Sequence, residues 1–160
     1  MRPGRQAARA SGYLAVALAF ASAATSAYWL FGGTALLDTV GGSIERLARD
    51  RSISTLAGGA AVVVAKVIGG ALALCVMRSR SSRLATFTAA VGWLLALYGA
   101  VLTVGGALAL LGVFGAAGES PSDEHALRWH VMLWDPWFFV WGVALAVAGM
   151  SVRGRLSRGG

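Results

Sequence analysis

The sequence predicts an all-α integral membrane protein, a four-helix up-down-up-down bundle with both termini in the cytoplasm. Of its 160 residues, 57% are hydrophobic and only 13% are charged, which is about half the usual share of charge. Four long apolar stretches follow one another with short connections, as expected for antiparallel neighbours. Because these runs lack the two-residue alternation of a membrane β-barrel, helices are the expected spanning form. We expect a single transmembrane domain over residues 1–160.

The first predicted span covers residues 13–37. Arginines 2, 5 and 9 precede it, and the letters SAATSA inside it resemble the end of a cleavable secretory signal. The apolar run, however, continues through YWLFGGTALL to Leu37. That length is too great for a signal core and suits a membrane span of about 20 residues or more. We therefore expect a retained span.

The second and third predicted spans cover residues 53–77 and 84–114, and a tight basic turn separates them. Only the second span contains a formal charge, Lys66. Glycine and alanine recur along both spans, which predicts close approach of helix backbones. The single cysteine, Cys75, excludes an intrachain disulfide, and we assign it no role.

The fourth predicted span covers residues 136–152, and a short outer helix of about residues 121–134 precedes it. Pro121 suits a first helical turn, and acidic residues follow it at once. Pro136 lacks an N–H and disfavours the α conformation in Asp135, so we expect no smooth helix at that point. Two structures satisfy this: Asp135 caps a new helix after a break, or one long helix is kinked.

The distribution of arginine predicts the orientation. Three clusters without acidic residues fall on one side of the predicted spans: Arg2, Arg5, Arg9, Arg78, Arg80, Arg83, Arg153, Arg155 and Arg158. The other side mixes basic and acidic residues, so the positive-inside rule places both termini in the cytoplasm. Lys66 is the only lysine among the 14 basic residues, a bias typical of GC-rich bacterial genomes. We expect a multi-pass protein of a bacterial plasma membrane.

Lys66 is the strongest candidate for a functional residue. It lies near the predicted centre of the bilayer, where a lysine costs about 2.5–3.5 kcal/mol, and small residues surround it on the helix face. Intramembrane charges usually pair, and Asp135 on the fourth span is the favoured partner. We predict an outward-facing polar pocket that consists of Lys66, Asp135, Tyr98, Trp29, His130 and, as a weaker candidate, Asp38. The alternative is a lysine that snorkels or has a structural partner.

An aromatic run surrounds Asp135 in the letters WHVMLWDPW. Tryptophan is enriched at the membrane–water interface, where its ring is buried and its N–H is hydrated. We therefore predict an aromatic interface that consists of Trp129, Trp134, Trp137 and Trp141. Within such a belt, Asp135 has a second interpretation as a simple helix cap.

Several kinds of chemistry are unsupported. The two histidines, His125 and His130, fall on one segment, whereas a bis-histidine haem needs ligands from two helices. A metal site made from them with Asp123 or Glu124 has no specific spacing, so we predict no metal and no cofactor. No phosphate-binding loop is present, and the basic clusters lack interleaved aromatic residues, so we predict no nucleic-acid partner. The expected partners are membrane lipids, a small apolar ligand and a second copy of the chain.

Two motifs carry a resemblance to a known family: YWLFGGTALLDTVGG at residues 28–42 and WHVMLWDPWFFVWGVAL at residues 129–145. The chain resembles a domain-of-unknown-function family of small four-span membrane proteins from high-GC Gram-positive bacteria. The resemblance marks eight characteristic positions: Trp29, Gly32, Gly33, Asp38, Trp134, Asp135, Pro136 and Trp137. It implies no activity, and it does not include Lys66.

The sequence therefore predicts an integral membrane protein that acts as a binding or accessory component with an outward-facing polar pocket. One alternative is a membrane enzyme acting on a lipid-like or isoprenoid substrate, in which Asp135 and His130 handle protons. A second alternative is a small homodimeric transporter. The two halves of the sequence share no convincing motif, which disfavours the transporter.

Overall fold

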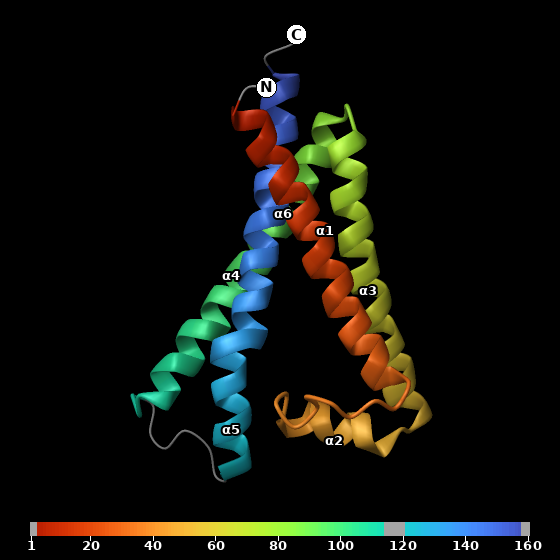
Figure 1. Ribbon diagram of the computed structural model, residues 1–160, viewed down its shortest axis with the longest axis vertical. Helices are drawn as coiled ribbons and strands as arrows, with labels where there is room; N and C mark the ends of the chain where they lie inside the picture. Colours follow the sequence, from red (N-terminus) through yellow and green to blue (C-terminus); the bar gives the residue numbers. More distant parts are fainter. Residues whose placement is uncertain (1–2, 114–120, 158–160) are drawn as a thin grey trace.

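The computed structural model describes residues 3–113 and 121–157, and every regular element within them is helical (Figure 1). The elements are α1 (Pro3–Leu30), α2 (Gly42–Asp50), α3 (Ile53–Arg78), α4 (Ser82–Leu110), α5 (Pro121–Trp129), the π-helical turn η1 (His130–Trp134) and α6 (Asp135–Leu156). Four stretches of the described helices are long and apolar enough to span a membrane: Arg9–Leu30, Ile53–Arg78, Ser82–Leu110 and Asp123–Leu156. The chain is thus all-α with four candidate spans.

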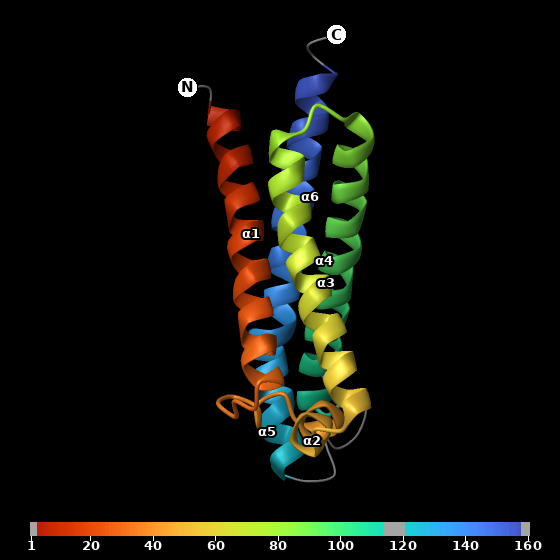
Figure 2. The ribbon, with the colours of Figure 1, turned by 90° about the vertical axis from the view of Figure 1, so that its right-hand side faces the viewer.

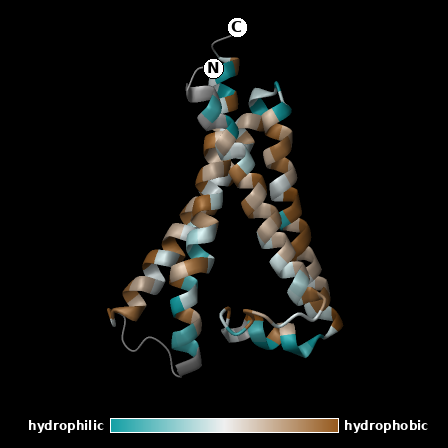
Figure 3. Ribbon diagram, viewed as in Figure 1, coloured by the Kyte–Doolittle hydropathy of each residue, from teal (hydrophilic) through white to brown (hydrophobic). Residues whose placement is uncertain are grey.

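The four long helices alternate in direction, and both termini lie at the same end of the molecule (Figures 1 and 2). We call this end the arginine end and the opposite end, which carries α2 and α5, the loop end. Helix α1 packs mainly on α3, α4 packs mainly on α6, and α1 also packs on α6. In Figure 1 these two helix pairs diverge toward the loop end. Hydrophilic residues gather at both ends, with hydrophobic residues between them (Figure 3).

Small residues allow the closest helix contact, between α4 and α6. A Cβ atom on Gly142 would lie 2.2 Å from the backbone nitrogen of Ala96, and one on Gly99 would lie 2.3 Å from that of Phe139. The backbones therefore touch directly, as the recurring small residues predict. The core nearby also consists largely of alanine: Ala15, Ala19, Ala73, Ala144, Leu145 and Trp141.

The first helix ends at Leu30 rather than at Leu37, the predicted end of the span. The reason is Gly32, whose φ of +96° is a conformation that glycine adopts at little cost. Residues 31–41 then form a compact loop in which Leu37 and Thr39 are only 2% exposed. Helix α2 was not predicted, although its apolar and charged residues recur with helical spacing.

The chain continues as helix from Pro121 through η1 to Leu156, which agrees with the second of the two alternatives, one long helix, and not with a break at Asp135. Asp135 is helical, with φ −77° and ψ −43°, and its N–H bonds to the carbonyl oxygen of His130, one residue beyond the α-helical partner. Pro136 has no N–H and would crowd a regular turn. The widened turn accommodates the proline, so Asp135 caps no helix end.

The third long helix, α4, ends at Leu110, and a turn follows over residues 111–113. The predicted end of this span, Phe114, lies outside the described residues.

Candidate functional site

Lys66 of α3 reaches across to α1. Its Nζ donates to the Ser26 hydroxyl at 2.7 Å and to the Ser22 carbonyl oxygen at 3.4 Å. It also lies 5.7 Å from the centre of the Phe138 ring on α6, a cation–π distance. We call Lys66, Ser22, Ser26 and Phe138 the Lys66 cluster. Lys66 therefore points into the bundle, as expected, and its ammonium is hydrogen-bonded by oxygens of another long helix.

The fourth long helix joins this cluster through an aromatic contact. The Tyr98 ring of α4 meets the Phe138 ring edge to face, with centroids 5.7 Å apart. Trp141 lies one turn further along α6, and its ring centroid is 6.2 Å from that of Phe138. Side chains of α1 and α6 therefore contact the ammonium of Lys66, and α4 contributes Tyr98 behind the Phe138 ring. Lys66 lies about 18 Å along α3 from Arg78.

The charge of Lys66 is not balanced within the described part of the chain. The ion pairs found there join Arg49 to Glu45, His125 to Asp38, Arg128 to Glu124 and His130 to Asp135. Both hydrogen-bond partners of Lys66 are neutral oxygens. A cation in an apolar environment with only neutral partners still attracts an anion.

Trp141 contributes a buried hydrogen-bond donor that has no acceptor among the described residues. Its side chain is 5% exposed, and its Nε1 has no hydrogen-bond partner in the described residues. The indole packs on Gly69, where a Cβ atom would lie 2.7 Å from Cζ2 of the ring. Gly69 lies one turn after Lys66, so both donors are on the same side of α3.

A second polar cluster lies at the loop end, where the loop of residues 31–41 meets η1. His130 lies 3.1 Å from Asp135 through Nδ1 and 3.1 Å from the Val40 carbonyl oxygen through Nε2. Trp134 Nε1 donates to the Thr39 hydroxyl at 3.1 Å. We call these five residues the loop clamp. The loop clamp attaches the loop after α1 to η1 and to the start of α6.

The partners of His130 determine where its protons are. The Val40 carbonyl oxygen only accepts hydrogen bonds, so Nε2 carries a proton. One more proton must lie between Nδ1 and Asp135, either on the ring of an ion pair or on the carboxyl of a neutral pair. Asp135 is only 5% exposed. The shared proton removes the repulsion between the lone pair of His130 Nδ1 and that of the Asp135 carboxylate oxygen. Both nitrogens of His130 are therefore occupied.

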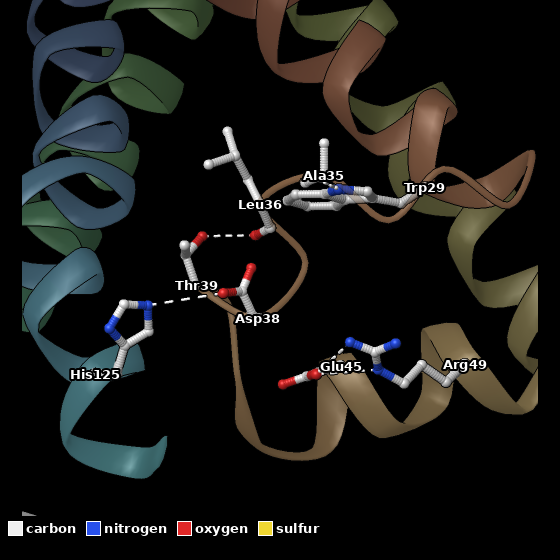
Figure 4. A network of polar contacts seen from close by, with 8 residues as sticks. All are labelled: Trp29, Ala35, Leu36, Asp38, Thr39, Glu45, Arg49 and His125. Atoms are coloured by element: carbon white, nitrogen blue, oxygen red, sulfur yellow. Dashed lines mark hydrogen bonds and ion pairs between the residues drawn. The ribbon is translucent and has the colours of Figure 1, made fainter. Parts of the chain in front are cut away.

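Two further predicted residues lie beside the loop clamp (Figure 4). The Trp29 ring packs edge to face on Trp134, with centroids 5.5 Å apart, and its Nε1 donates to the Ala35 carbonyl oxygen at 2.9 Å. Asp38 faces His125 of α5 at 3.8 Å, and both side chains are more than half exposed. Neither Trp29 nor Asp38 bonds to Lys66.

The predicted pocket is thus divided between two clusters on successive turns of α6. Lys66 and Tyr98 meet Phe138, whereas Asp135, His130, Trp29 and Asp38 lie in or beside the loop clamp. The favoured Lys66–Asp135 pair is not formed, because Asp135 is held by His130 and Lys66 turns to α1. Ser22 and Ser26 were not among the predicted site residues, although two serines four residues apart in an apolar span lie on one helix face and were a usable signal.

The four tryptophans of the predicted aromatic interface have different environments. Trp134 contacts Thr39 and Trp129 contacts His125, both at the loop end. Trp137 donates to the Leu18 carbonyl oxygen of α1 at 3.2 Å, inside the bundle. Trp141 belongs to the core, contrary to the expectation of an interfacial ring, because Gly69 leaves space for its indole.

Among residues 3–113 and 121–157, no group of three or more His, Cys, Asp or Glu side chains has the arrangement to hold a metal ion.

Comparison with known proteins gives one match. A family model described as protein of unknown function (DUF3995) matches residues 18–145, which is more than half of the chain. The matched region contains both aromatic motifs, the Lys66 cluster and the loop clamp. Neither the curated proteins nor the solved structures include a significant match.

Proposed function

The chain belongs to the DUF3995 family of proteins of unknown function, and we propose that its Lys66 cluster binds an amphiphile that carries an anionic group. The four apolar helices fit an integral membrane protein. In this proposal the protein is a membrane-embedded binding component. Lys66 contacts the anionic group, and the aromatic rings of α4 and α6 contact the apolar part.

One observation carries this proposal: an ammonium deep in a candidate span is held only by neutral oxygens of α1. The ammonium has three N–H groups, and Ser22 and Ser26 accept two hydrogen bonds from them. One donor and the net charge are left for another molecule. A carboxylate or a phosphate supplies both the acceptor and the opposite charge.

The surroundings favour an amphiphile over a small ion. Tyr98 is 53% exposed and lies edge to face on Phe138, so an aromatic surface extends from the ammonium toward the outside of α4. Leu94 and Leu97 continue this exposed apolar surface on α4. A ligand with a hydrocarbon chain buries that surface, whereas an inorganic anion leaves it in contact with the bilayer.

The alternative of a membrane enzyme needs a group that exchanges protons with a substrate. His130 is the natural candidate, but its two nitrogens bond to Val40 and Asp135. A general base needs a free lone pair within reach of the substrate. Binding is therefore the function that this geometry supports best.

The proposal is tested by ligand binding to the purified full-length protein in detergent micelles. The probes are oleate, dioleoylphosphatidylglycerol and oleyl alcohol, which differ in having a carboxylate, a phosphate and no charge. We expect Lys66→Met to weaken binding of at least one anionic probe about tenfold or more, the loss of one charge-assisted contact. Lys66→Arg keeps the charge and should restore part of that affinity.

Arg46→Gln is the matched control, because it removes an exposed positive charge from α2, outside the Lys66 cluster. We expect it to leave the affinity for both anionic probes unchanged, and no variant should alter the affinity for oleyl alcohol. If Lys66→Met binds oleate and the phospholipid as tightly as the wild-type chain, Lys66 contacts no anionic ligand and the proposal is wrong.

A further inference from the structure

The arginine end carries a second surface, and we propose that it binds the phosphate headgroups of anionic phospholipids. The described arginines of this surface come from α1, the turn between α3 and α4, and the end of α6. They are Arg9, Arg78, Arg80, Arg83, Arg153 and Arg155, and we call them the arginine crown. This inference is independent of the Lys66 cluster, which lies about 18 Å away along α3.

Packing brings the three segments of the crown together. Val76, Ala85, Ala148 and Val152 form one buried cluster, so the end of α3, the start of α4 and the end of α6 meet. Each of these segments carries crown arginines within two residues of the cluster. Helix α1 joins them, because Gly12 lies against the Met77 side chain. The helix ends that carry these arginines therefore lie at one end of the molecule although they come from distant parts of the sequence (Figure 2).

Within residues 3–113 and 121–157, the crown has no counter-charge. All six side chains are exposed, and none forms an ion pair with a described residue. The sequence places no Asp or Glu in residues 3–37, 51–113 or 136–157. Six like charges at one end of a bundle repel one another, and bound anions relieve that repulsion. The structure thus favours a partner with several negative charges or several separate anions.

Exposed apolar side chains next to the crown indicate that these anions belong to lipids. Tyr13 lies one helical turn below Arg9, Phe87 one turn below Arg83, and Met150 one turn below Arg153; these three side chains are 64%, 58% and 42% exposed. Each pair thus presents a guanidinium at the arginine end and an apolar surface next to it on the side of the loop end. A phospholipid has the same order of groups, a phosphate above hydrocarbon chains. A soluble polyanion covers the guanidinium alone.

The chemistry of the guanidinium fits this partner. Its planar donors form paired hydrogen bonds with two phosphate oxygens, which a lysine ammonium does not match. Each basic residue near an anionic membrane surface strengthens binding by about fivefold. The positive-inside rule predicts that this end faces the cytoplasm, where the negative surface potential of the inner leaflet attracts it.

The test compares lipid binding by the full-length protein in micelles, where membrane orientation has no influence. The probes are dioleoylphosphatidylglycerol and dioleoylphosphatidylcholine, and native mass spectrometry counts the lipids retained. The variant replaces Arg9, Arg83 and Arg153 by glutamine, and the control replaces Arg46, Arg49 and Arg128 by glutamine, which removes the same charge from the loop end. We expect each of the three crown substitutions to lower the preference for phosphatidylglycerol over phosphatidylcholine about fivefold. The loop-end control should keep the wild-type preference.

Arg→Lys substitution at the same three positions should restore only part of that preference, because the paired hydrogen bonds are lost. Each crown substitution should have the same effect on this preference in the Lys66→Met background as in the wild-type chain, which separates this surface from the Lys66 cluster. Equal loss in the crown variant and the loop-end control contradicts the proposal, because it shows a general effect of charge. Displacement of the lipid by inorganic phosphate or heparin at matched charge concentration also overturns it, in favour of a soluble anion.

Discussion

His130 on the π-helical turn donates through Nε2 to the carbonyl oxygen of Val40, 90 residues earlier in the sequence, at 3.1 Å. This bond joins the two aromatic motifs on which the family resemblance rests, since Val40 belongs to the first motif and His130 to the second. Trp29 and Thr39 of the first motif also contact Trp134 of the second. The two characteristic motifs thus form one structural unit at the loop end.

The His130–Asp135 pair should be a large contribution to stability. His130→Leu leaves a buried carboxylate without its partner, and we expect a loss of about 3–5 kcal/mol in the free energy of unfolding. Asp135→Asn keeps a hydrogen-bonding group and should cost about 1 kcal/mol. Unfolding in mixed micelles by titration with sodium dodecyl sulfate measures both. A loss below about 0.5 kcal/mol for His130→Leu would show that Asp135 finds another partner.

The Trp134–Thr39 hydrogen bond is suited to a double-mutant cycle. Trp134→Phe removes the donor and keeps an aromatic ring, whereas Thr39→Val removes the acceptor and keeps the branched shape. We expect a coupling free energy of about 1 kcal/mol, the usual value for a neutral hydrogen bond. Strictly additive effects of the two substitutions on the free energy of unfolding would show that the bond contributes nothing.

The contact between α4 and α6 should tolerate no side chain at Gly142. A Cβ atom there would lie 2.2 Å from the Ala96 nitrogen, so Gly142→Ala must separate two backbones. We expect it to cost about 2 kcal/mol or more. Gly105→Ala is the control, because nothing lies within 4 Å of the added atom. The free energy of unfolding of Gly105→Ala should rise by about 0.5–1 kcal/mol, because alanine lowers the entropy of the unfolded chain. A similar loss of stability in both variants would refute the backbone contact.

Lys66→Met should keep the fold while it weakens ligand binding. Burial of the ammonium opposes stability, so its removal should leave the free energy of unfolding unchanged or raise it by about 1–3 kcal/mol. Ser26 keeps a possible acceptor in the backbone one turn earlier. Circular dichroism during thermal unfolding in micelles measures the change. A clear loss of stability would identify Lys66 as a structural residue, held in place by its bonds to α1.

Residue composition and hydropathy were sufficient to predict the class of this protein. A run such as Ile53–Met77 is apolar apart from Lys66 and a few small polar residues, and the backbone of such a run in lipid must bond to itself, so helices follow from local sequence alone. The number of candidate spans and their alternating direction followed from the same counting (Figure 1). The contact between the two aromatic motifs did not, because residues 28–42 and 129–145 are separated by two spans.

Three features depended on the tertiary structure. The partner of Lys66 is set by the rotation of α1 against α3, which places Ser22 and Ser26, not Asp135, beside the ammonium. Trp141 enters the core because Gly69 of another helix leaves space for it. The helix passes Pro136 because the His130–Asp135 and His130–Val40 bonds compensate for a widened turn. Local sequence thus determined which long apolar segments form the candidate spans, whereas the pairing of polar groups depended on which helix faces meet.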